Sequence, residues 1–109
     1  MFILGRVPTT TMFEPSMKIL VWNCRGAGNN SFRRNFLEIA MTHYPSIAVL
    51  TETRIFGARA ENVSNALGFD SVCRADADGF RGCIWLLWHS GVVNLNILSF
   101  TAQAIHATI

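Results

Sequence analysis

Two oxygen-bearing side chains stand where strands of this sequence are expected to end. Asn23 follows the largely apolar run 18–22, and Glu52 follows the run 47–51. Because a helical pattern separates the runs, we expect two parallel strands whose carboxyl ends share one edge, about 4.8 Å apart. Ligands of open α/β sheets bind at that edge. A carboxylate beside a carboxamide suits Mg²⁺, which keeps water and substrate phosphate as its remaining ligands.

The same stretch allows two other interpretations. Glu52 could be an ordinary solvated residue just past a strand. Alternatively, Gly26-Ala27-Gly28-Asn29-Asn30-Ser31 approximates the G-x-G-x-x-G loop of dinucleotide-binding domains, with Glu52 near the position of the ribose-binding acid. Serine replaces the third glycine of that motif, and residues 22–25 intervene where the strand should turn directly into the loop.

The elements that must position these residues follow from the hydrophobic patterns. Strands are predicted at 18–22, 47–50, 69–75, 83–88, 92–98 and 103–109, and helices at 31–42 and 58–67, with Gly68 capping the second helix. This order predicts a mixed α/β layer with a parallel pair first and antiparallel neighbours later. Residues 1–16 contain two prolines and a threonine run, and we expect them to form a loose leader.

The composition excludes several classes of protein. Half of the residues are apolar and 15% are charged, which is too apolar for a disordered tail, and no apolar run approaches the roughly 20 residues of a membrane span. The three cysteines are odd in number and form no C-x-x-C pair, which indicates reduced thiols and an intracellular protein, nuclear or cytoplasmic. Eight of the nine basic residues are arginine, whose planar donors suit phosphate, although solvated surface arginines explain this equally well.

Three segments of the sequence resemble one protein family. Residues 17–26 (MKILVWNCRG) resemble the opening strand of endonuclease/exonuclease/phosphatase (DNase I-like) domains, in the form found in plant non-LTR (LINE-type) retrotransposons. Residues 47–53 (IAVLTET) resemble the family's second motif, and residues 79–88 (GFRGCIWLLW) resemble its glycine-led strand. The resemblance covers residues 17–109, which we interpret as a truncated domain of this family.

The resemblance implies a fold and an activity. The fold would be the N-terminal half of a four-layered α/β sandwich, and the complete domain would be a Mg²⁺- or Mn²⁺-dependent hydrolase that nicks DNA. By position, Glu52 would bind the metal, Asn23 would support the metal shell or a phosphate oxygen, and Arg25 and Arg54 would contact the DNA backbone.

The family's later Gly-Asp-Phe-Asn-like and Ser-Asp-His segments are absent from this sequence. We therefore expect this chain alone to be inactive, with the missing C-terminal half of the domain as its structural partner. A non-catalytic nucleic-acid-binding remnant is the alternative, followed by the dinucleotide-binding domain. The role of His106, in the last predicted strand, stays open.

Overall fold

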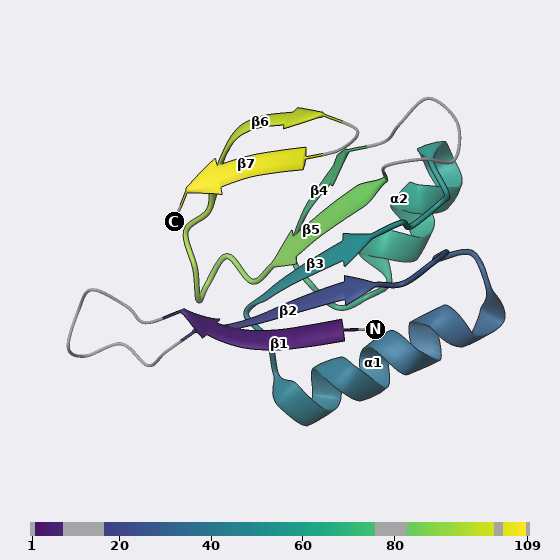
Figure 1. Cartoon of the computed structure of the whole chain (residues 1–109), viewed down its shortest axis with the longest axis horizontal. Helices are drawn as coiled ribbons and strands as arrows, with labels where there is room; N and C mark the ends of the chain where they lie inside the picture. Colours follow the sequence, from purple (N-terminus) through teal and green to yellow (C-terminus); the bar gives the residue numbers. More distant parts are fainter. Residues whose placement is uncertain (1, 8–16, 76–82, 102–103, 109) are drawn as a thin grey trace.

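The computed structural model describes residues 2–7, 17–75, 83–101 and 104–108. Five strands form one mixed sheet in the order β1-β2-β3-β5-β4, and two more form a separate hairpin (Figure 1). The sheet strands are β1 (Phe2–Val7), β2 (Met17–Asn23), β3 (Ile47–Thr51), β4 (Ser71–Ala75) and β5 (Ile84–Trp88). The chain is therefore an α/β fold with a mixed sheet and two helices.

The predicted parallel pair at the centre of the sheet is confirmed. Leu20 of β2 lies opposite Ala48 of β3, and all other pairs of neighbouring strands in the sheet are antiparallel. The crossover between them is α1 (Asn30–His43), which begins where the Asn29 side chain accepts hydrogen bonds from two backbone N–H groups and ends at Tyr44, in left-handed conformation before Pro45.

The second helix, α2 (Gly57–Asn65), is shorter than predicted. Its C-cap is Ala66, and Gly68 takes a left-handed conformation (φ 89°) two residues later, so the prediction of Gly68 as the cap is wrong. Backbone bonds from Ala66 to Val63 and from Leu67 to Ser64 tighten the last turn and bury the Leu67 side chain.

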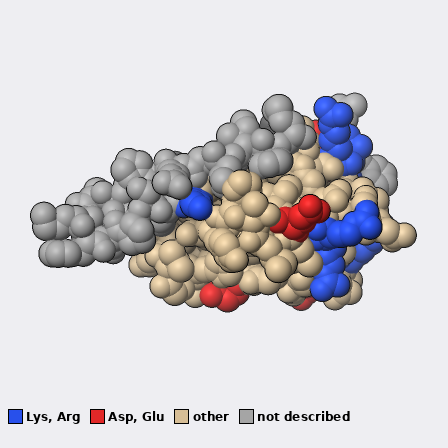
Figure 2. Space-filling view, turned by 90° about the horizontal axis from the view of Figure 1, so that it is seen from below, with Lys and Arg blue, Asp and Glu red and all other residues tan. Residues whose placement is uncertain are grey.

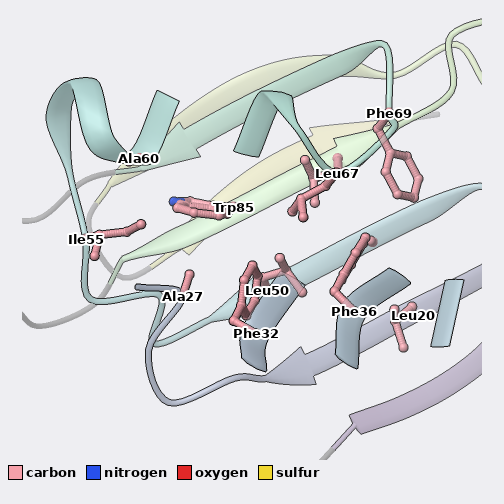
Figure 3. Close-up of a cluster of buried hydrophobic side chains, with 12 residues drawn as sticks. Leu20, Ala27, Phe32, Phe36, Leu50, Ile55, Ala60, Leu67, Phe69 and Trp85 are labelled. Carbon is pink, nitrogen blue, oxygen red and sulfur yellow. The ribbon is translucent and has the colours of Figure 1, made fainter. Parts of the chain in front are cut away.

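The principal core lies between the helices and one face of the sheet (Figure 3). Residues alternate along each strand, so Leu20, Leu50 and Trp85 all point to this face. From α1, Phe32 and Phe36 complete the layer, with the Phe32 ring meeting Trp85 edge-on at 6.2 Å. The predicted apolar face of α1 is thus its packing surface.

The opposite face of the sheet is partly covered by a hairpin of β6 (Asn96–Thr101) and β7 (Ala104–Thr108), on the other side from α1 (Figure 1). Ile47 and Leu86 are buried there with Val93, and Ile97 and Ile105 pack against them. The hairpin leaves part of this face open, because Val21 is 37% exposed.

Two segments differ from the sequence-based prediction. Phe2–Val7, expected to lie in a loose leader, forms β1, antiparallel to β2. The open backbone edge of β2 explains this, since an edge strand offers N–H and C=O groups to any extended segment. The predicted strand 92–98 begins only at Asn96, because the N–H groups of Val92 and Val93 bond to His89 in a turn. Within the described ranges, no helix is long and apolar enough to cross a membrane.

Candidate metal and phosphate site at the carboxyl edge of the sheet

Asn23 and Glu52 lie at the same edge of the sheet, as the sequence predicts. Asn23 is the last residue of β2 and pairs with Thr51, the last residue of β3. The two chains stay bonded beyond the strands, through N–H groups of Cys24 and Gly26 that donate to the carbonyls of Thr51 (3.1 Å) and Glu52 (2.8 Å). A continuous ladder therefore fixes the loop after β2 against the loop after β3.

Both loops contain strained backbone. Arg25, Glu52 and Arg54 have positive φ angles of 52°, 54° and 60°. This left-handed region costs a residue with a side chain roughly 1–3 kcal/mol and persists where the surroundings enforce it. Three of the four positive-φ residues other than glycine in the described part of the chain thus lie at this edge. Such strain gathers at functional sites.

The Glu52 carboxylate is accessible and lies beside a cation. Its side chain is 42% exposed, and its Oε1 is 3.4 Å from the Arg54 guanidinium, which is 49% exposed. The separation is long for an ion pair, and solvent screens it, so the contact is worth less than about 1 kcal/mol. In this structure Arg54 contacts Glu52, and a phosphate would have to compete with that contact.

Asn23 supplies an oxygen without a donor. Its Oδ1 is buried, and none of the described residues donates a hydrogen bond to it. A buried acceptor left in this state is unfavourable unless a cation or water meets it. Asn23 and Glu52 supply a carboxamide oxygen and a carboxylate, donors of the kind that suits a hard cation such as Mg²⁺. The described residues contain no cluster of three His, Cys, Asp or Glu side chains, so water and phosphate would complete the shell.

Cys24 is a site residue that the sequence interpretation did not use. Its thiol donates to the carbonyl oxygen of Thr51 at 3.3 Å, and burial raises its pKa above the usual value of 9.0. The group is therefore a protonated structural contact between the two loops at neutral pH. In the sequence, only the position of Cys24 between Asn23 and Arg25 could have indicated that it belongs to the site.

Several arginines belong to the loops at this edge or to the starts of the two helices. Figure 2 shows most of the visible Lys and Arg at one end of the molecule, with one further basic group apart from them. The exposed arginines of the loops after β2 and β3 and of the first turns of α1 and α2 are Arg25, Arg33, Arg54 and Arg59. We call this set the basic pole. It includes Arg25 and Arg54, and it adds two arginines that were not singled out from the sequence.

The glycine-rich loop has a different role from the one in a dinucleotide-binding domain. Arg59 donates to the carbonyl oxygen of Gly28 at 2.8 Å, and a Cβ atom on Gly28 would lie 2.8 Å from its Nη2. A guanidinium thus occupies the close approach that the second glycine of the motif would give to a pyrophosphate. This loop precedes α1 in the chain, and the bond from Arg59 connects it to α2.

Among the residues whose side chains the structure describes, no group of three His, Cys, Asp or Glu residues forms a second candidate metal site. His89 stacks on Phe69 with ring centres 4.3 Å apart, and residues 76–82 lie outside the described ranges. The side chain of His106, in β7, is likewise not described. No protein-family model matches this chain, and no curated protein matches it either.

Proposed function

We propose that the chain is the N-terminal part of a Mg²⁺-dependent phosphodiesterase domain of the endonuclease/exonuclease/phosphatase type, from a retrotransposon-like protein whose substrate is DNA. One observation carries the proposal. The carboxylate of Glu52, on strained backbone, lies at the carboxyl edge of two parallel strands together with the side-chain oxygen of Asn23, to which none of the described residues donates a hydrogen bond. The likeness of residues 17–26 and 47–53 to the family's first two motifs supports it.

In this proposal each residue has a distinct task. Glu52 holds the metal by charge, and Asn23 contributes a neutral oxygen beside it. A bound Mg²⁺ supplies positive charge to phosphate oxygens. Arg25 and Arg54 contact the DNA backbone, with Arg54 exchanging its contact with Glu52 for one with phosphate. The general base and the other ligands belong to the C-terminal half of the domain, so this chain alone has little or no turnover.

The remaining sandwich layers follow from the same proposal. The sheet face opposite α1 is only partly covered by β6 and β7, and Val21 is exposed on it. A layered α/β domain buries both faces of its sheet. The C-terminal half would complete that cover and deliver its catalytic groups to the edge at Glu52.

Plasmid nicking tests this function. The chain is joined to the C-terminal half of a LINE-type endonuclease domain, and conversion of supercoiled DNA is followed with and without Mg²⁺. We expect nicking that depends on Mg²⁺, and a loss of about 100-fold or more in Glu52→Gln. Glu61→Gln, an exposed glutamate of α2, is the matched control and should keep full activity. Full activity in Glu52→Gln would contradict the proposal.

A second candidate is nucleic-acid binding without catalysis. The basic pole favours it, since phosphate contacts alone bind nucleic acid without any metal. The same hybrid protein separates the two candidates. Binding to DNA without Mg²⁺-dependent nicking would support the second candidate and reject the first.

A further inference from the structure

A cavity of about 360 Å³ opens between the start of α1 and the exposed side of α2. We call it the α1–α2 cleft. Its polar lining consists of Asn29, Asn30, Arg33, Arg59 and Asn62, and its floor is apolar. The cleft is separate from Asn23 and Glu52, neither of which lines it.

The cleft has the chemistry of an anion site. Two arginines and three asparagines are among its lining residues, and no carboxylate is. The side chain of one of them, Asn29, is already hydrogen-bonded in the N-cap of α1. Glu61 of α2 is exposed but does not line it. Guanidinium groups bind phosphate through paired, charge-assisted hydrogen bonds, so a cavity whose charged lining residues are only arginines suits an anion.

One of the two arginines is already fixed in place. The bond from Arg59 to the Gly28 carbonyl uses one of its five N–H donors, and its side chain is otherwise exposed. Ile55 also contacts this position, because a Cβ on Gly28 would lie 3.1 Å from its Cγ2. A guanidinium held this way loses less conformational entropy when it binds a ligand.

The backbone connects the cleft to the sheet edge that carries Asn23 and Glu52. The loop 24–28 runs from Asn23 to the cleft, and Ala27 donates to the carbonyl of Thr53 at 2.7 Å, which bonds it to the loop that carries Glu52. Arg33 and Arg59 belong to the same basic pole as Arg25 and Arg54. A polyanion with repeated phosphates can contact both places at once.

We propose that the α1–α2 cleft binds a backbone phosphate of nucleic acid, flanking the phosphate handled at Glu52, through Arg33 and Arg59. This inference rests on the proposed function. It assigns the cleft a role in substrate binding that does not depend on the metal. The shared chemistry is a phosphate group, and free phosphate and a nucleic-acid backbone are distinguished by experiment.

The first test measures affinity for a fluorescent DNA duplex by anisotropy, with EDTA present and at several salt concentrations. Arg33→Gln is compared with Arg34→Gln, which removes the same charge from the next residue of α1 but does not line the cleft. We expect Arg33→Gln to weaken binding about tenfold and to lower the salt slope by about 1, against a much smaller change in Arg34→Gln. Equal effects of the two substitutions, or no binding by the parent chain, would overturn the proposal.

The second test follows amide resonances during a titration with inorganic phosphate. Shifts centred on Gly28 and Arg59 that disappear in Arg33→Gln are expected. Binding of inorganic phosphate without binding of the duplex would make the cleft a site for a free anion and reject the nucleic-acid assignment. Because EDTA removes metal, the two proposals fail separately. Loss of the Arg33 effect leaves the metal role of Glu52 intact, and failure of Glu52 to bind metal leaves the cleft intact.

Discussion

The carboxylate of Glu52 lies 3.4 Å from the guanidinium of Arg54, and both residues hold left-handed backbone conformations. Two residues of opposite charge therefore share one strained turn directly after β3. The ion pair is half-exposed and contributes little to stability, whereas the backbone strain costs energy. Stability alone does not account for this arrangement, whereas the proposed role of Glu52 in metal binding would account for it.

Replacing Glu52 by glycine should stabilise the fold while removing its carboxylate. Glycine takes positive φ without steric cost, so we expect Glu52→Gly to be about 1 kcal/mol more stable than Glu52→Gln. Both variants lose the ion pair with Arg54, and the amide oxygen in Glu52→Gln can still accept a hydrogen bond from Arg54, so a more stable Glu52→Gly reports relief of the backbone strain. Urea unfolding measures it. Equal stability of the two would show that the left-handed conformation at Glu52 carries no strain.

Phe36 should be the largest contributor to the stability of α1. Its side chain is fully buried and stacks on Trp22 with ring centres 6.2 Å apart. Truncation to alanine should cost about 3–5 kcal/mol in the free energy of unfolding. Met41, on the same helix and 70% exposed, provides the control, and Met41→Ala should change little. Similar losses in both variants would contradict the described packing of α1.

A methyl group on Gly28 should disrupt the joint between α1 and α2. In Gly28→Ala the new Cβ would lie 2.8 Å from Arg59 Nη2 and 3.1 Å from Ile55 Cγ2, so the Arg59 guanidinium must shift and its bond to the Gly28 carbonyl is weakened. We expect a loss of about 1–2 kcal/mol in unfolding free energy. Gly91→Ala has open space around it and should stay within about 0.5 kcal/mol of the parent. A neutral Gly28→Ala would argue against the Arg59 contact.

Asp70 should make stability depend on acid pH. The Ser90 N–H (2.9 Å) and the Ser71 hydroxyl (2.8 Å) donate to its carboxylate and hold its pKa below the usual 3.8. A lowered pKa gives stabilisation that is present above pH 3.8 and is lost as the pH falls through the folded-state pKa. Asp70→Asn should melt at a lower temperature than the parent at pH 7.

The difference between the melting temperatures of the parent and Asp70→Asn should shrink below pH 3.8. Glu38→Gln removes an exposed carboxylate from α1 and controls for net charge. A gap between Asp70→Asn and the parent that stays constant across pH would rule out the hydrogen bonds as its cause.

The sequence predicted the features that rest on strong local patterns. The apolar runs around Leu20 and Val49 are typical of covered strands, and the helical spacing of Phe32 and Phe36 between them favours a crossover helix. The shared edge of Asn23 and Glu52 follows from that topology alone. This is why the central part of the fold and the position of the candidate site were predictable.

Features that depend on tertiary contacts were not predictable. β1 forms because β2 has an open edge, and its own residues show no period. The strand predicted after Trp88 starts too early in the chain, because two consecutive valines favour a strand. In the structure these valines lie in a turn, and Val93 is buried there. Arg59 binds Gly28 from 31 residues away, a contact that no local spacing indicates.

The most direct measurement of the central claim is the broadening of amide resonances by Mn²⁺, which substitutes for Mg²⁺ at oxygen sites. The account predicts that signals of residues 23–27 and 51–54 broaden first, that excess Mg²⁺ restores them, and that the effect disappears in Glu52→Gln but persists in Glu61→Gln. Broadening centred elsewhere, or unchanged in Glu52→Gln, would contradict the assignment of Glu52 as the metal ligand.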